Sequence, residues 1–150
     1  MEFVELRDII DFAVEKEQEA MDFYNEHAEK VKEKSIAEEL RKMALMEKGH
    51  RDRLKNLDVE AASQNVKKSG ENLKIADYLV EIEPGPDMSW QNAIQIAMKR
   101  ELAAMNLYTD LAKLVSDPMA KQMFKNLSAE EGSHKLYWEK IWDEEVLKDN

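Results

Sequence analysis

The sequence contains no cysteine among its 150 residues, and only four glycines and three prolines. The absence of cysteine excludes disulfide bonds, a thiolate nucleophile, a cysteine-held iron-sulfur cluster and a zinc-ribbon site. Any metal must therefore be held by oxygen and nitrogen ligands. Few glycines and prolines, together with 43% apolar and 36% charged residues, favour one soluble, mostly helical domain spanning 1–150.

Positive charge is also in short supply. Lysine and arginine number 22 against 32 acidic residues, which gives a net charge of −10. Nucleic acids and anionic membranes bind basic surfaces, so we expect neither as a partner. No apolar run approaches membrane-spanning length, and residues 1–8 lack the basic and then apolar layout of a secretion signal. We therefore expect a cytoplasmic protein.

Apolar residues recur at helical spacing in four segments. Steps of three, four or seven predict helices over about 6–32, 36–57, 90–115 and 118–147. The first two helices are joined by a short turn, as are the last two, so each pair forms a hairpin. Residues 58–88 are long enough to cross along the bundle. The predicted fold is all-α, a four-helix bundle of two hairpins with one long crossover.

Three of these helices have N-terminal capping signals. Ser35 is followed three residues later by Glu38, which predicts a capping box at the second helix. Ser89 precedes the third helix, and Asp117 followed by Pro118 precedes the fourth. We expect these three residues to cap their helices.

Six residues of metal-ligating type form an internal repeat. Glu17, Glu47 and His50 recur 84 positions later, without insertion or deletion, as Glu101, Glu131 and His134. All six occupy positions that the apolar pattern assigns to the core. Burying four ionised carboxylates together is strongly unfavourable unless positive charge lies among them. Two divalent cations would neutralise them, and neutral imidazoles would add two nitrogen ligands.

The spacing of the repeat is specific. A Glu-x-x-His pair presents both side chains on one helix face about one turn apart. Two such pairs, together with one glutamate from each of the other two helices, are typical of ferritin-like di-iron and di-manganese bundles. The sequence therefore predicts a two-metal site.

The motifs also carry a family resemblance. The chain resembles ferritin-like proteins of the rubrerythrin group in its Glu-x-x-Ala-x-x-x-Tyr and Glu-x-x-His motifs, which are Glu17 with Ala20 and Tyr24, Glu47 with His50, Glu101 with Ala104 and Tyr108, and Glu131 with His134. This resemblance implies two iron ions with an oxo or hydroxo bridge. It implies that Glu47 and Glu131 bridge the ions. Glu17 and His50 would complete the ligands of one ion, and Glu101 and His134 those of the other.

Two departures from the group bear on activity. Rubrerythrins commonly carry a further glutamate at the position of Ala104, and it is linked with their peroxide chemistry. They also commonly carry a rubredoxin domain with four cysteines, which this sequence lacks. Both differences weaken a peroxidase assignment without affecting the metal ligands.

Several neighbouring residues have two possible interpretations. Tyr24 and Tyr108 either pack in the core or donate hydrogen bonds that orient a ligating carboxylate, and we favour the second because both copies of the repeat keep them. His27 lies ten residues from Glu17, about 15 Å along a helix, which is too far for a ligand. Gly49 is interpreted as a point of close helix approach.

The function we expect is that of a di-iron oxidoreductase. It would reduce hydrogen peroxide or dioxygen with electrons from an external donor protein, and it would form a homodimer. One alternative is a ferroxidase or iron-handling protein. Another is a ferritin-like protein that binds manganese or zinc without redox turnover, because oxygen and imidazole ligands do not select iron by themselves.

Overall fold

Helices account for most of the chain. The structure, a computed structural model, describes residues 5–63, 74–80 and 89–148. These residues contain no strand, and their helices are α1 (Leu6–Lys30), α2 (Lys34–Lys55), α3 (Val59–Ser63), the 3-10 helix η1 (Ile75–Tyr78), α4 (Trp90–Leu114) and α5 (Pro118–Lys148). None of these described helices is both long and apolar enough to cross a membrane. The chain divides into two compact units, Met1–Ser63 and Gln64–Asn150.

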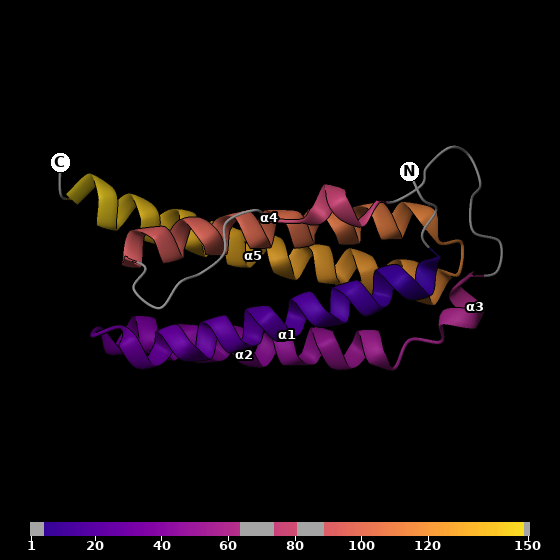
Figure 1. Cartoon of the computed structure of the whole chain (residues 1–150), viewed down its shortest axis with the longest axis horizontal. Helices are drawn as coiled ribbons and strands as arrows, with labels where there is room; N and C mark the ends of the chain where they lie inside the picture. Colours follow the sequence, from indigo (N-terminus) through magenta and orange to yellow (C-terminus); the bar gives the residue numbers. More distant parts are fainter. Residues whose placement is uncertain (1–4, 64–73, 81–88, 149–150) are drawn as a thin grey trace. The chain divides into compact units, whose positions relative to one another are not determined.

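The first unit is a hairpin of α1 and α2, which lie side by side in Figure 1. Glu5 and Asp8 form a capping box at the start of α1, where the Glu5 amide donates to Asp8 Oδ2 over 3.3 Å. One face of each helix is buried. Large residues on these faces include Ile9, Ile10, Tyr24, Leu40, Met43 and Leu54.

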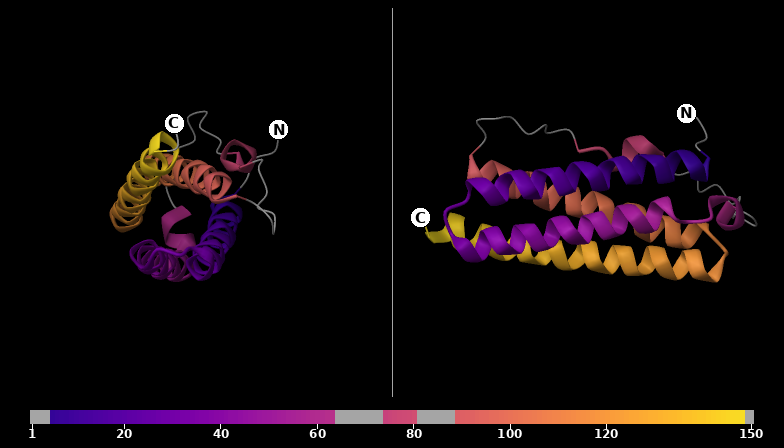
Figure 2. Two further views of the ribbon diagram at one scale, coloured as in Figure 1. Left: turned by 90° about the vertical axis from the view of Figure 1, so that its left-hand side faces the viewer. Right: turned by 90° about the horizontal axis from the view of Figure 1, so that it is seen from below.

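The second unit is the corresponding hairpin of α4 and α5, which can be followed from orange to yellow in Figure 2. Ser89 Oγ accepts from the Asn92 amide over 3.1 Å, and Asp117 Oδ2 accepts from the Ala120 amide over 2.9 Å. Both predicted caps are therefore confirmed. The Tyr78 hydroxyl donates to Asp110 Oδ2 over 2.6 Å and so attaches η1 to α4.

The internal repeat extends to the helix ends. Helix α4 begins and ends 84 residues after α1, and α5 begins 84 residues after α2. The four long helices begin and end within two residues of the predicted bounds. The prediction of two helical hairpins in an all-α fold is confirmed, whereas a single domain over 1–150 stays a prediction.

Two details of the hairpins and their connection differ from expectation. The prediction that Ser35 caps the second helix is wrong, because the Glu33 carbonyl already accepts from the Ala37 amide over 3.0 Å and places Ser35 in the first turn. The short helix α3 was not predicted, and the Asp58 carboxylate caps it by accepting from the Ala61 amide over 3.0 Å. Residues 64–73 and 81–88 of the predicted crossover lie outside the described residues.

Candidate metal centre

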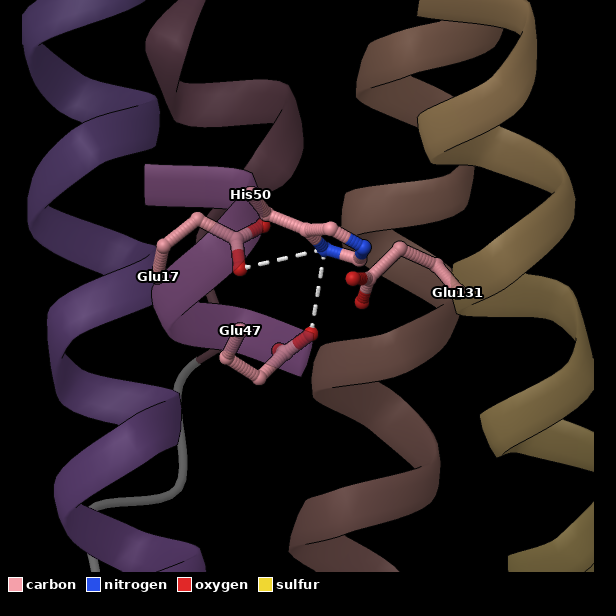
Figure 3. A group of neighbouring side chains, drawn as sticks. All are labelled: Glu17, Glu47, His50 and Glu131. Carbon is pink, nitrogen blue, oxygen red and sulfur yellow. Dashed lines mark ion pairs between the residues drawn. The ribbon is translucent and has the colours of Figure 1, made fainter. Parts of the chain in front are cut away.

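The α1–α2 hairpin brings three of the predicted ligands together. Figure 3 shows the imidazole of His50 directed between the carboxylates of Glu17 and Glu47. His50 Nδ1 lies 3.5 Å from Glu17 Oε2 and 3.2 Å from Glu47 Oε1. The three side chains are buried, with relative exposures of 0 to 3%. This set comes from two helices, with Glu17 on α1 and the other two residues on α2.

Helical periodicity explains why these polar side chains face inward. Glu17 is four residues after Ala13, which is buried, so the two residues share one helix face. Glu47 lies four residues after the buried Met43, and His50 lies four residues before the buried Leu54. Each ligand therefore follows the apolar stripe of its own helix, and the packing that buries the stripe also buries the ligand.

The α4–α5 hairpin repeats the arrangement. Glu101 on α4 and Glu131 and His134 on α5 are buried, with exposures of 1 to 4%. His134 Nδ1 lies 3.6 Å from Glu101 Oε2. In each hairpin the three residues offer one ligand atom apiece, and those atoms lie within 4.8 Å of one another. The structure thus brings together all three predicted ligands of each half within its own hairpin.

The spacing of these atoms suits a metal ion. Two ligand atoms bonded to one ion at about 2.1 Å lie about 3.0 Å apart in an octahedral site and about 3.4 Å apart in a tetrahedral one. The measured separations of 3.2, 3.5 and 3.6 Å are close to this range. Each set also carries two carboxylates and one imidazole, whose charge one divalent cation neutralises when the imidazole is neutral. The donor sets therefore fit a divalent metal.

The two tyrosines near the ligands are fully enclosed. Tyr24 and Tyr108 are each 1% exposed. The Tyr24 ring lies edge-on to Phe23 at 5.7 Å between centroids, and the Tyr108 ring stacks on Phe124 at 6.5 Å. These contacts account for the packing of both rings. The role of their hydroxyls as donors to ligating carboxylates stays a prediction.

The structure also assigns His27 and Gly49. His27 belongs to neither ligand set; its Nδ1 lies 3.0 Å from the Phe23 carbonyl oxygen, and its ring packs against Phe23. The interpretation of Gly49 as a point of close helix approach is wrong. A Cβ atom at Gly49 would meet nothing within 4 Å, whereas one at Gly132 would lie 3.3 Å from Met105 Sδ. The closer side-chain contact is therefore at Gly132, in the second hairpin.

The structure also shows a pair of residues that sequence reasoning missed. Arg51 Nη1 donates to Gln18 Oε1 over 2.5 Å and so joins α2 to α1. Gln18 directly follows the ligand Glu17, and Arg51 directly follows the ligand His50. The sequence repeat offered one signal of this pair, because the matching positions in the second half hold different residues, Leu102 and Lys135.

Comparisons with known proteins agree with the predicted fold and family. No curated protein matches the chain. A crystal structure of a Thermotoga maritima protein, assigned to the ferritin-like di-iron-carboxylate proteins, matches with a TM-score of 0.75 over 97% of this chain and 99% of that chain. The two sequences are 19% identical, so this likeness shows the ferritin-like fold alone. The rubrerythrin family model matches residues 8–141, and the chain therefore belongs to the rubrerythrin family.

Proposed function

We propose that this protein is a di-iron oxidoreductase that reduces hydrogen peroxide or dioxygen. The observation that carries the proposal is the presence, in each hairpin, of two buried carboxylates and one buried imidazole with ligand atoms within 4.8 Å. Membership of the rubrerythrin family and likeness to a protein assigned as di-iron-carboxylate support iron as the metal. The two sets together would hold two ions, with Glu47 and Glu131 as the bridging ligands.

The bound metal would supply the electrons. When bound, iron would supply the two electrons that, together with two protons, convert hydrogen peroxide into two water molecules. The sequence contains no cysteine for a second redox centre. We propose that an external donor protein returns the two electrons.

The protein's own residues contribute burial and proton supply. The ligands are at most 4% exposed, so bulk water is excluded and the charge of each carboxylate acts at low dielectric. Tyr24 and Tyr108 are the enclosed hydroxyl groups closest in sequence to Glu17 and Glu101, seven residues away. We propose that each donates a hydrogen bond to a ligating carboxylate and can pass a proton inward.

A stoichiometric oxidation tests the proposal. The metal-free protein is loaded anaerobically with two ferrous ions per chain and mixed with limiting peroxide or dioxygen, while ferric absorbance and oxidant loss are followed. One peroxide should be consumed for every two irons oxidised. Glu47→Ala and His134→Ala should lose this reaction, and Glu38→Gln, which removes an exposed carboxylate from α2, should retain it. Unchanged oxidant consumption in the two ligand variants would overturn the proposal.

Assembly state separates this function from iron storage. We propose that the chain forms a homodimer and is located in the cytoplasm. Gel filtration distinguishes the two, since a cage of many subunits elutes far ahead of a dimer. A cage that takes up many ferrous ions per chain would favour the iron-handling alternative.

A further inference from the structure

The two ligand sets match in chemistry but differ in the residues that follow them. In the first hairpin the Arg51 guanidinium donates to the Gln18 side chain across the helix pair. Its Nε and Nη2 atoms also donate to Asp52 Oδ1 over 3.2 and 3.1 Å. The Gln18 amide nitrogen donates in turn to Asp22 Oδ1 over 3.0 Å. A chain of hydrogen bonds therefore fixes both members of the Gln18–Arg51 pair.

The second hairpin lacks this arrangement at the matching positions. Leu102, in place of Gln18, has no hydrogen-bonding side chain. Lys135, in place of Arg51, bonds within its own helix to Glu139 Oε1 over 2.6 Å. The helices α4 and α5 are instead joined one turn away, where Ser128 Oγ donates to the Met105 carbonyl oxygen over 3.1 Å. At these two matching positions, only the first hairpin has a side-chain bond across the helix pair.

The difference affects how firmly each ligand set is held. Hydrogen bonds from an ionised donor are roughly twice as strong as those between neutral groups. The Gln18–Arg51 bond joins the residue after Glu17 to the residue after His50, so it opposes separation of these two ligands. Charge does not explain a difference between the sets, because Lys135 carries the same charge as Arg51 and each is paired with a carboxylate. The two hairpins differ in whether this cation bonds across the helix pair, as Arg51 does, or within its own helix, as Lys135 does.

We propose that Gln18 and Arg51 are positioning residues that make Glu17, Glu47 and His50 the higher-affinity set, which binds a divalent cation before Glu101, Glu131 and His134 do. A ligand set that is held in its bound geometry loses less conformational freedom when the ion enters. Residues that orient metal ligands typically change metal affinity by about 10- to 100-fold when substituted. This inference rests on the proposed metal centre but not on peroxide or dioxygen reduction.

Calorimetric titration of the full-length, metal-free protein with Co²⁺ tests the order of filling. We expect two binding steps of unequal affinity. His134→Ala should keep the tighter step, and His50→Ala should keep only the weaker one. Equal steps, the opposite assignment of the steps, or no binding of Co²⁺ would each overturn the inference.

Substitution of the pair tests its cause. Arg51→Lys keeps the positive charge but loses the forked donor, and Gln18→Leu copies Leu102 of the second hairpin. Each should weaken the tighter step by about tenfold and leave the weaker step unchanged. The matched control Lys135→Arg should change neither step. Equal weakening of both steps, no weakening, or the same effect from Lys135→Arg would contradict the proposal.

Two measurements separate positioning from a general loss of stability. Thermal unfolding of the metal-free variants measures any general loss of stability, because the bond between Arg51 and Gln18 also joins the two helices. A lowered melting temperature with unchanged Co²⁺ affinities would show a purely structural role and overturn the inference. Ordered Co²⁺ binding without peroxide or dioxygen reduction would instead contradict the proposed function alone, and reduction with equal Co²⁺ affinities would contradict this inference alone.

Discussion

The α1–α2 and α4–α5 hairpins place the same three ligand types at the same helical positions, yet different side chains join the helices of each pair. The first is joined by Gln18 and Arg51 next to the ligands. The second is joined by Ser128 and Thr109, whose hydroxyls lie 2.8 Å apart, and by Lys121, which donates to the Ala112 carbonyl oxygen. Despite this, the distance from histidine Nδ1 to the α1 or α4 glutamate is 3.5 Å in one hairpin and 3.6 Å in the other.

This contrast shows which residues the chemistry constrains. A metal ion bonds directly to the carboxylates and imidazoles, so their type and position must be the same in both halves. The joining side chains do not bond to the metal, so their type can differ between the halves while the ligand distances stay similar. The repeat therefore keeps the residue type at every ligand position but not at the positions directly after them.

The largest expected difference in stability between the hairpins concerns the core residue that lies four positions after each histidine ligand. Trp138 and Leu54 occupy matching positions four residues after the histidines, and both are fully buried. Trp138→Ala should lower the free energy of unfolding by about 3–5 kcal/mol, because it leaves a large cavity beside Trp90, whose ring lies 5.8 Å away. Trp138→Leu, which copies the first hairpin, should cost less. Urea unfolding measures both.

A surface substitution controls this comparison. Leu136 is 67% exposed on the same helix, so Leu136→Ala should change the free energy of unfolding by no more than about 0.5 kcal/mol. An equal loss for Leu136→Ala and Trp138→Ala would show that the matching core positions do not dominate the stability of α5.

A smaller effect is expected where η1 attaches to α4, a contact that belongs to the second unit. Burial, and next the Asp110 carboxylate, raise the pKa of the Tyr78 phenol above its usual value of about 10. Tyr78→Phe removes its hydrogen bond to Asp110 and should lower the free energy of unfolding by about 1.5–3 kcal/mol at pH 7. Denaturant unfolding measures this loss.

The pH dependence gives a second test of the same contact. Because the folded-state pKa is raised, the stabilisation is complete below about pH 10 and is lost as the pH rises further, when the unfolded chain releases the proton more readily. The parent protein should lose stability above pH 10 more steeply than Tyr78→Phe. Parallel pH profiles would contradict the assigned contact.

Sequence reasoning succeeded where a local pattern determines the structure. The six predicted ligands are buried in two sets of three because the 3.6-residue period fixes which side of a helix each residue faces. Ser89 and Asp117 cap their helices as expected because a cap depends on only three or four consecutive residues.

Sequence reasoning failed where two neighbouring residues could each begin a helix, or where the residue that forms a contact is distant in sequence. Ser35 carries a capping signal, but the helix is capped two residues earlier, at Glu33, whose carbonyl accepts the first helical hydrogen bond. No pattern within α2 could show that Gly49 faces open space, or that Arg51 would bond to a residue 33 positions earlier. Both depend on which residues of α1 and α2 meet, and this is a property of the folded hairpin.

Helix caps provide the next comparison, with an expected effect of about 1 kcal/mol. Asp117 caps α5 through its side chain, whereas Glu33, at the matching position before α2, makes no such hydrogen bond. Asp117→Ala should therefore lower the free energy of unfolding by about 1 kcal/mol, and Glu33→Ala by much less. Thermal and urea unfolding of the two variants check this difference. Equal losses would show that the side-chain bond to the Ala120 amide contributes little.

The smallest expected effect concerns the two glycines that lie inside α2 and α5. A Cβ atom at Gly49 meets nothing within 4 Å, so Gly49→Ala should raise the free energy of unfolding by about 0.5–1 kcal/mol through helix propensity alone. Gly132→Ala gains the same propensity but places its Cβ atom 3.3 Å from Met105 Sδ, which must move. Its gain should therefore be smaller, or absent.

Met105→Ala combined with Gly132→Ala should show favourable coupling in a double-mutant cycle, because the shortened side chain removes the contact. Equal gains at both glycines, with no coupling to Met105, would mean that the Met105 side chain imposes no packing constraint at Gly132.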